Sequence, residues 1–377
     1  MDLPKNEMKI NLAIVSTSLN MYSETFIQAH KYIPGTNVRF YYGDPLPTML
    51  EGKGALEKNI LISALMHYLG KALGYPFKDR RENTLSRSLR TEKIECVLAE
   101  YGTTGAKILN VCKKNGIPLL VHFHGYDASL GYILEQYKIA YKDMFSYASA
   151  VFVVSKVMQI KIEALGCPPE KIYYTPYGPH DKFLDIQPTL EKKAFISVGR
   201  FVDKKAHYYT ILAFKEVLKA HPDAKLVIAG DGVLLNTCTN LVRNLKIEHA
   251  VSLPGVITQQ KFLNHLKVVR AYVQHSITAL DGDMEGMPVS IIEASAAGVP
   301  VISTRHAGIP DVIIDKKTGL LVDEHDVEGM SKQMLKVLEN KVYAQELGER
   351  GKSFIAENFS LQKHLRAISQ VIKDSLT

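Results

Sequence analysis

The stretch "AFISVGRFVDKKAHYYTI" (residues 194–211) decides the fold of this 377-residue chain. It begins with an apolar run typical of a buried strand, continues with a Gly-Arg pair and a Lys-Lys pair, and ends in a helical segment. A strand that passes through a short loop into a helix is the unit of a parallel α/β sheet. Because this unit recurs on both sides of the stretch, we predict alternating strands and helices from end to end.

The alternation falls into two blocks, which are separated by the polar, proline-containing segment "YGPHDKFLDIQPTLEKK" (residues 177–193). Strands are expected at "INLAIVST", "VRFYYG", "CVLAEYG", "PLLVHFHG", "AVFVVS" and "KIYYTPYG" before it, and at "AFISVGRF", "KLVIAGDG", "AVSLPGV", "AYVQHSI", "VPVISTR" and "GLLVDE" after it. We therefore predict two doubly wound, Rossmann-like α/β domains facing across a cleft, with ligands at the carboxyl ends of the strands. The predicted bounds are 1–185, 186–355, and a final amphipathic helix within 356–377 that Ser360 caps.

The composition fits this prediction. A chain of this length is expected to form two domains, and 46% hydrophobic and 23% charged residues are typical of a globular protein. The four cysteines show no CxxC spacing, which favours reduced core thiols over a disulfide or metal set. The apolar run from Ile10 to Val15 is too short for a signal peptide, and no segment is apolar enough to span a membrane. We expect a cytoplasmic protein.

Residues 51–95 carry nine basic and six acidic residues. Aromatic residues do not alternate with the basic ones, so nucleic-acid binding is not expected. The apolar run "ILISALMHYLGKAL" (residues 60–73) is followed by Lys78, Arg80, Arg81, Arg87 and Arg90. It predicts either an amphipathic helix in weak, peripheral contact with an anionic membrane at the inner face of the cell membrane, or a core helix of the first domain. The sequence leaves both alternatives open.

A second stretch, "DGDMEGMPVSIIEASAAGVP" (residues 281–300), carries the chemistry. Pro288 is predicted to begin a helix that Gly298 ends, with Glu285 in the preceding loop and Glu293 about 8 Å further along the helix axis. The unpaired amides between the two glutamates form a site for a phosphate. A sugar nucleotide fits this arrangement, with Glu293 on the ribose and Glu285 on the hexose. The alternative is that both glutamates have ordinary structural partners.

Basic residues in the stretch 194–211 complete the predicted anion site. Arg200 follows a strand and Lys205 precedes the next helix, so both can converge on one diphosphate and stabilise it as it leaves. The alternative is that they are solvated surface residues. We interpret the "DGD" of residues 281–283 as a loop rather than a metal site, since the two basic residues supply the charge that a metal would.

The first domain contributes "LLVHFHGYDAS" (residues 119–129), in which His122 and His124 share one face of a strand and His124 faces the cleft. The two histidines could form part of a zinc site, but no third ligand suggests itself, and we predict no metal. In "STSLNMYSETFIQAH" (residues 16–30), Ser23 is expected to cap a helix with Glu24 in its first turn. An acceptor-binding role for this segment is equally open.

These motifs resemble the retaining family-4 glycosyltransferases of GT-B fold. The resemblance rests on "GRFVDKKAHYYTI", "LVIAGDGVLL", "VSLPGVIT" and "DGDMEGMPVSIIEASAAGVPVISTRHAGIPDVI". The likeness to the colanic-acid and exopolysaccharide branch is closer, through "SETFI", "HFHGYD" and "DGDMEGMPVS". It implies an N-terminal acceptor-binding domain, a C-terminal domain that binds the nucleotide sugar, and a last helix that crosses back onto the first domain.

The resemblance also implies roles for individual residues. The expected catalytic residues are His124 near the transferred sugar, Glu285 at the hexose, and Arg200 and Lys205 at the diphosphate. The expected donor-binding residues are Arg200, Lys205, Glu285, Gly286, Met287, Pro288, Val289 and Glu293. The chain departs from the family pattern in Ala206, where a glycine is usual, and in His275, where a proline is usual and which is expected to border the donor site.

The expected function is transfer of a hexose from a nucleoside-diphosphate sugar, with UDP-hexose favoured by the branch, to a carbohydrate acceptor that is lipid-linked. The resemblance implies retention of configuration, and neither cofactor nor metal is expected. Two alternatives remain: a sugar-nucleotide epimerase or hydrolase, and a catalytically silent sugar-nucleotide-binding subunit. A glycosidase that uses the two glutamates is disfavoured, because Glu293 is expected inside a helix behind the phosphate site. The sequence does not name the donor base, the hexose, the acceptor, the linkage or the oligomeric state.

Overall fold

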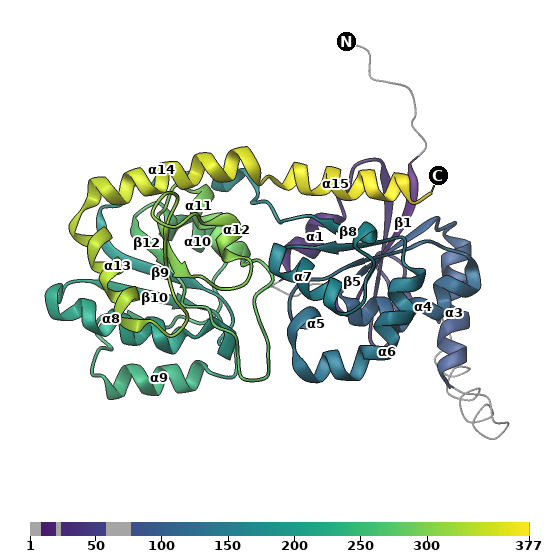
Figure 1. The fold of residues 1–377 in the computed structure, drawn as a ribbon, viewed down its shortest axis with the longest axis horizontal. Helices are drawn as coiled ribbons and strands as arrows, with labels where there is room; N and C mark the ends of the chain where they lie inside the picture. Colours follow the sequence, from purple (N-terminus) through teal and green to yellow (C-terminus); the bar gives the residue numbers. More distant parts are fainter. Residues whose placement is uncertain (1–8, 20–23, 58–76, 377) are drawn as a thin grey trace, which may run out of the picture.

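The computed structural model describes residues 9–19, 24–57 and 77–376 and shows two α/β domains (Figure 1). The described strands form an eight-stranded sheet of order β4-β3-β2-β1-β5-β6-β7-β8 and a six-stranded sheet of order β11-β10-β9-β12-β13-β14. All pairs are parallel except β2–β3 and β3–β4. The predicted fold class is therefore confirmed.

The first domain contains every strand that the sequence predicts there, together with a short antiparallel edge hairpin that it does not. The hairpin strands are two residues long and therefore carry no periodic pattern. The strands are β1 (Ile10–Ser16), β2 (Thr36–Tyr42), β3 (Met49–Leu50), β4 (Gly54–Ala55), β5 (Cys96–Glu100), β6 (Leu119–His122), β7 (Ala150–Val153) and β8 (Ile172–Tyr174). The helices are α1 (Thr25–His30), α3 (Phe77–Thr91), α4 (Gly102–Asn115), α5 (Tyr126–Ser129), α6 (Gly131–Tyr147) and α7 (Lys156–Ala164), with a 3₁₀ turn at η1 (Pro169–Lys171).

The second domain repeats the pattern. Its strands are β9 (Lys192–Val198), β10 (Lys225–Ala229), β11 (Val251–Ser252), β12 (Val269–Val273), β13 (Val301–Thr304) and β14 (Leu320–Val322). Its helices are α8 (His207–Ala220), α9 (Leu235–Asn244), α10 (Gln259–Leu266), α11 (Val289–Ala296), α12 (Ile309–Val312), α13 (Val327–Glu339) and α14 (Lys341–Asn358), and 3₁₀ turns lie at η2 (Asp181–Phe183) and η3 (Asp203–Lys205).

The order of strands places a ligand crevice in each sheet. In the first sheet β1 lies between β2 and β5, and in the second β9 lies between β10 and β12, so the chain winds in opposite directions from these central strands. Ligands of such sheets bind outside the carboxyl ends of the strands at this switch point. The loops after β1 and β9 are therefore expected to line the site.

The last helix, α15 (Leu361–Asp374), packs on the first domain, whereas α14 lies along the second (Figure 1). Ser360 caps it as predicted, since the Ser360 hydroxyl accepts a hydrogen bond from the Lys363 amide at 3.1 Å. The predicted apolar stripe is also confirmed, because Leu365, Ile368 and Ile372 are buried in one cluster with residues of β1 and β2. The end of the chain therefore joins the two domains.

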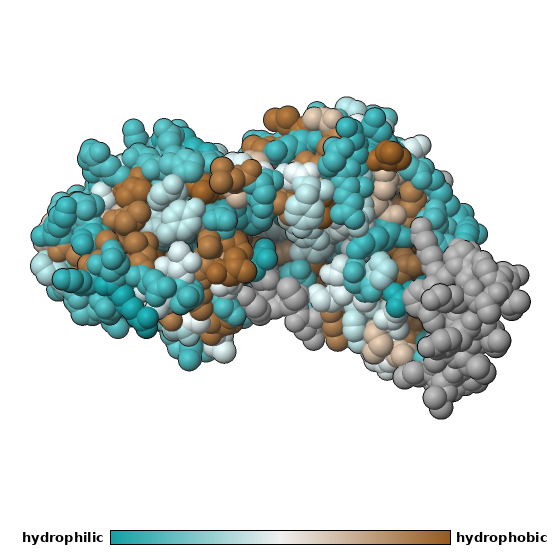
Figure 2. All heavy atoms as spheres, turned by 90° about the horizontal axis from the view of Figure 1, so that it is seen from below, coloured by the Kyte–Doolittle hydropathy of each residue, from teal (hydrophilic) through white to brown (hydrophobic). Residues whose placement is uncertain are grey.

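The four cysteines are free and buried, which confirms the prediction of reduced core thiols. No helix in the described ranges is long and apolar enough to cross a membrane. The face shown in Figure 2 carries polar side chains over both domains, with apolar side chains in small groups between them. The apolar run 60–73, for which we predicted a membrane-surface helix or a core helix, lies outside the described residues.

Candidate functional site

A cleft of about 480 Å³ lies between the carboxyl ends of the two sheets. All of the site residues expected from the sequence line it: His124, Arg200, Lys205, Glu285, Gly286, Met287, Pro288, Val289 and Glu293. They come from the segments that follow β6 and β9 and from the loop and helix of α11. The residues that the resemblance groups together are thus close in space, although they span 170 residues of sequence.

The loop that precedes α11, called the acidic loop from here on, holds Glu285 in a buried position beside the Lys205 ammonium. The Lys205 ammonium lies 2.8 Å from a Glu285 carboxylate oxygen. The Glu285 amide donates to Nε2 of His306 at 3.1 Å, and Nδ1 of His306 lies 2.7 Å from Glu324. Burial alone would raise the pKa of Glu285, but the ammonium groups of Lys205 and Lys204 hold this pKa below its ordinary value. The carboxylate is therefore ionised and fixed before any ligand arrives.

Gly286 is a point of close approach between the two domains. A Cβ atom at this position would lie 2.0 Å from the carbonyl oxygen of His124, so no residue larger than glycine fits without movement of the backbone. Nearby, the Gly131 amide donates to the Asp281 carbonyl at 2.8 Å, and the Met284 amide donates to the Ser129 hydroxyl at 3.1 Å. The acidic loop of the second domain is thus docked directly on the first.

The "DGD" segment lies in this loop, as interpreted from the sequence. Asp283 pairs with the buried Lys204 at 2.9 Å, and the same ammonium also donates to the Met284 carbonyl. The carboxylate of Asp281 accepts a hydrogen bond from the Asp283 amide at 3.1 Å. The segment therefore contributes to the loop's own structure through these contacts.

Helix α11 begins one residue later than predicted. Pro288 occupies the N-cap position with extended ψ, and Val289 is the first helical residue. In the described part of the chain, the amides of Val289 and Ser290 donate to no protein acceptor, and both residues line the cleft. The Ser290 hydroxyl donates to the Val198 carbonyl at 3.0 Å, which ties this helix end to β9. The N-terminus of α11 therefore presents free N–H groups to the cleft.

Glu293 lies in α11 and is half-buried. Burial raises its pKa to about 8, and the Gln259 side chain and the Lys182 ammonium only partly oppose this shift. Gln259, which lines the cleft, accepts a hydrogen bond from the Lys182 ammonium. Burial thus favours the neutral form of the Glu293 carboxyl group, although the Gln259 side chain is its hydrogen-bond partner.

The two basic residues of the expected clamp occupy different environments. Arg200 is exposed at the end of β9, whereas Lys205 in η3 is engaged by Glu285. Ala206 follows in the left-handed region with φ of 38°, which explains why a glycine is usual at this position. His275, which we expected to border the donor site, is buried and is not among the residues that line the cleft. Its Nε2 accepts a hydrogen bond from the His325 amide at 2.9 Å, and the adjacent Ser276 hydroxyl donates to Glu285.

His124 lies at the cleft floor, as predicted, and two residues that the sequence analysis missed hold it. Nε2 of His124 lies 2.8 Å from Glu100, and Nδ1 lies 2.5 Å from the Tyr177 hydroxyl. Asp127 accepts hydrogen bonds from the amides of His124 and Gly125. Glu100 could have been found, because it ends β5, the strand that neighbours β6, whereas Tyr177 comes from the segment between the domains.

The prediction that Glu24 lies in the first turn of a helix is wrong. Helix α1 begins at Thr25, and Glu24 occupies the N-cap position without a capping hydrogen bond from its side chain. Its carboxylate instead accepts from the Tyr101 hydroxyl at 2.8 Å and lines the cleft. Ser23, the predicted cap, lies outside the described residues.

Comparison with known proteins identifies the class to which this fold and cleft belong. The family model "Glycosyltransferase Family 4" matches residues 51–179, and the model "Glycosyl transferases group 1" matches residues 181–354. The chain therefore belongs to the glycosyltransferases that these two models describe, with one model on each domain.

Its relatives include the amylovoran biosynthesis glycosyltransferase AmsK of Erwinia amylovora, which is 32% identical over 246 residues, 64% of this chain and 60% of the relative. The putative colanic acid biosynthesis glycosyltransferase WcaL of Escherichia coli is 29% identical over 288 residues, 76% of this chain and 67% of the relative. The chain thus spans about three fifths of AmsK and two thirds of WcaL. These relatives confirm the expected likeness to the exopolysaccharide branch.

Solved structures agree on the fold. HepE of Anabaena in complex with UDP superposes with a TM-score of 0.76 at 13% identity, over 97% of this chain and 100% of HepE. Sucrose-phosphate synthase of Thermosynechococcus elongatus superposes with the same TM-score at 17% identity, over 97% and 99% of the two chains. At such low sequence identity, the structural likeness shows the fold alone, which is the arrangement of the two domains.

The raised pKa of Glu293 predicts a pH dependence of stability. Between its ordinary pKa of 4.5 and about 8, the folded protein keeps a proton that the unfolded chain has lost. The free energy of unfolding should therefore fall as pH rises through this window, by at most about 1.4 kcal/mol per pH unit. Glu293→Gln should remove this component, and thermal unfolding from pH 5 to 8.5 measures it. The exposed Glu248→Gln serves as control, and parallel curves for wild type and Glu293→Gln would contradict the assignment.

Proposed function

We propose that this protein is a retaining, metal-independent glycosyltransferase that moves a hexose from a nucleoside-diphosphate sugar, favoured to be a UDP-hexose, to a carbohydrate acceptor in cell-surface polysaccharide biosynthesis. One observation carries the proposal. Two glutamates, Glu285 and Glu293, flank a helix N-terminus with free amides, in a cleft between two Rossmann-like domains. Membership of the family supports the reaction class.

The cleft offers a separate partner for each part of the donor. The free amides of α11 and the cations of Arg200 and Lys205 suit the diphosphate. Glu293 lies beyond them and suits the ribose diol, and the desolvation that raises its pKa would be relieved by hydrogen bonds from two hydroxyls. Glu285 lies towards the first domain and suits the hydroxyls of the hexose.

Transfer follows from the same arrangement. Arg200 and Lys205 would stabilise the negative charge that grows on the leaving diphosphate. The ion pair with Glu285 already holds the Lys205 ammonium in place, so little movement of this side chain is required. We propose a front-side displacement in which the departing diphosphate takes the proton from the acceptor hydroxyl. His124, fixed by Glu100 and Tyr177, would hold the transferred sugar, and Glu24 on the opposite wall would bind the acceptor.

The identity of the donor base is supported by comparison. Solved structures of HepE contain UDP, or UDP-glucose, and HepE shares the fold. Among the more distant curated relatives, an enzyme of Mycolicibacterium smegmatis is named a GDP-mannose-dependent phosphatidylinositol monomannoside mannosyltransferase, at 28% identity over 45% of this chain. The donor in that name differs from the proposed UDP-hexose, whereas the phosphatidylinositol acceptor in it supports a lipid-linked acceptor.

The first test separates the roles of the two glutamates. Glu293→Ala should weaken donor binding at least about tenfold, because the ribose loses a hydrogen-bonded partner in a desolvated site. Glu285→Ala should lower turnover more than donor affinity. Calorimetric titration with UDP-, GDP- and ADP-hexoses, together with steady-state transfer assays, measures both effects, and Glu248→Ala is the surface control. If Glu293→Ala binds all three donors as wild type does, the ribose assignment fails.

The second test concerns the charge at the diphosphate. Activity should survive treatment with EDTA, and Arg200→Ala and Lys205→Ala should each lower turnover on the order of 100-fold, as loss of a transition-state stabiliser does. The exposed Arg243→Ala in α9 should act as wild type. Activity that EDTA abolishes and Mg²⁺ or Mn²⁺ restores would overturn metal independence.

The third test concerns the lipid-linked acceptor, for which docking on an anionic membrane through residues 51–95 would be needed. Within this segment the structure pairs Arg80 with Glu57 and Lys53 with Glu92, which reduces the free charge. We expect weak co-sedimentation with anionic but not neutral vesicles, lost in high salt and on charge reversal of Arg80, Arg81 and Arg87. Reversal of Lys316 and Lys317 in the second domain is the control. No sedimentation at low salt would indicate a soluble acceptor.

A further inference from the structure

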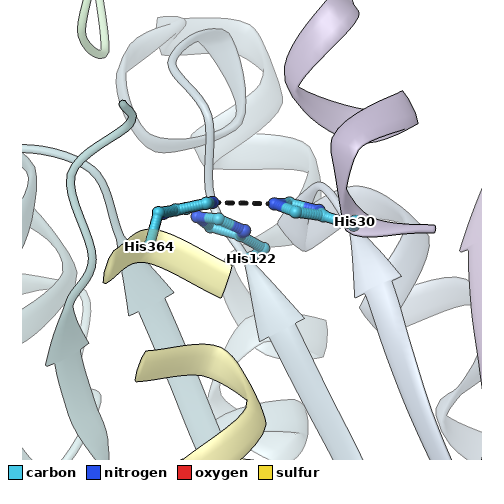
Figure 3. A group of neighbouring side chains, drawn as sticks. All are labelled: His30, His122 and His364. Carbon is cyan, nitrogen blue, oxygen red and sulfur yellow. Dashed lines mark hydrogen bonds between the residues drawn. The ribbon is translucent and has the colours of Figure 1, made fainter. Parts of the chain in front are cut away.

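Three histidines from distant parts of the sequence meet in the interior of the first domain (Figure 3). His30 ends α1, His122 ends β6, and His364 lies in the first turn of α15. All three side chains are buried, and one ring nitrogen of each lies within 4.8 Å of the others. The rings of His30 and His364 point towards each other, with His122 beside them (Figure 3).

The hydrogen bonds within the described residues do not satisfy this group. Both ring nitrogens of His122 are buried without a hydrogen-bond partner. A buried imidazole that has lost its hydrogen bonds to water and gained none is unfavourable, and in native proteins such groups usually have an ion or a water as partner. The arrangement around His122 therefore points to a bound species.

The contacts of His30 match those of a metal ligand. Its Nδ1 lies 2.6 Å from one oxygen of the buried Glu100, so we assign the proton to Nδ1 and the lone pair to Nε2. Nε2 lies 2.9 Å from Nε2 of His364. Histidines that bind metals characteristically donate their second nitrogen to a carboxylate, which orients the ring and makes the ligand nitrogen more basic. Glu100 has this role for His30.

We propose that His30, His122 and His364 bind one divalent transition-metal ion, with Zn²⁺ as the best fit. Three imidazoles and an open position suit Zn²⁺, whereas Mg²⁺ and Ca²⁺ prefer oxygen ligands. Ligand nitrogens about 2.05 Å from a tetrahedral zinc lie about 3.3 Å apart. The pair formed by His30 and His364 would therefore separate by about 0.4 Å, which small rotations of the two rings supply.

A neighbouring group is the weaker candidate. Glu100, His122 and His124 also bring one ligand atom each within 4.8 Å. However, both ring nitrogens of His124 are already engaged, by Glu100 and by Tyr177. The sequence analysis found no third ligand for His122; under the proposal its partners are His30 and His364 rather than His124.

The proposed ion would connect the end of the chain to the cleft. It would hold α15 and α1 against β6. Glu100, which orients His30 with one oxygen, would also help to orient His124, because its second oxygen lies 2.8 Å from Nε2 of His124. Its place in the domain interior separates it from any metal that would bind the donor diphosphate. The inference is therefore independent of the proposed function.

The experiment uses the untagged full-length protein. Elemental analysis of the purified protein should find about one zinc per chain. After removal of metal with a strong chelator, Co²⁺ should bind at one equivalent with the intense visible absorption of a tetrahedral site, and Zn²⁺ should displace it. Zn²⁺ should also raise the melting temperature of the metal-free protein. His364→Gln and His30→Gln should each weaken Co²⁺ binding on the order of 100-fold, since each removes one of three ligands, whereas the exposed His249→Gln should not.

Three results would overturn the proposal. The first is a purified protein without metal that gives neither a Co²⁺ spectrum nor a shift in melting temperature with Zn²⁺. The second is a His364→Gln variant that is folded by circular dichroism and binds Co²⁺ as wild type does. The third is a His124→Gln variant that no longer binds Co²⁺ together with a His30→Gln variant that binds it as wild type does. That result would place the site at Glu100, His122 and His124. If His364→Gln does not fold, His30→Gln and His122→Gln decide the same question.

Discussion

The close approach of two backbones at Gly286 is the constraint on which the rest of this structure depends. The glycine places the acidic loop of the second domain against the carbonyl of His124 in the first, at a distance that leaves no room for a side chain. The carboxyl ends of the two sheets therefore meet at one place, and the cleft between them is narrow enough for a single small ligand to contact both. Glu285, next in the chain, is consequently held close to His124 and its supporting residues.

Charge is arranged in this cleft before any ligand is present. The ion pair of Lys205 and Glu285 is largely desolvated, and a second pair, Lys204 and Asp283, fixes the loop from the other side. Opposite charges at such short distance keep Glu285 ionised despite its burial. Glu293 has no comparable cation, and its raised pKa shows the difference. The two carboxyl groups at the ends of this site thus differ, since the pKa of Glu285 is lowered and that of Glu293 is raised. Such a pair suits a ligand whose two ends differ chemically.

A buried polar network lies directly beneath the cleft. Glu100 accepts from His124 with one oxygen and from His30 with the other, and His30 contacts His364 of the last helix. The side chains of His364, His30 and Glu100 therefore link the C-terminal helix to His124 in the cleft. Such networks are favourable when every member is satisfied and costly when one is not, so the unsatisfied nitrogens of His122 are the feature of this region that most requires a partner.

The sequence by itself determined the fold class, the number of domains, almost every strand and the acidic and basic residues of the cleft. These follow from local patterns: apolar runs that mark buried strands, a glycine and a proline that bound α11, and a Ser360 cap. The two-residue strands β3 and β4 lie below the length at which a pattern can form.

Only the tertiary structure decided which distant side chains meet. The pairing of Glu24 with Tyr101, the support of His124 by Tyr177, the burial of His275 away from the cleft and the three-histidine group all join residues whose separation in sequence carries no information about distance. His30 and His364 are 334 positions apart, and their contact exists because the last helix buries its apolar stripe on the first domain. Local patterns specify what each segment becomes, whereas the packing of segments against each other decides what its polar groups can bind.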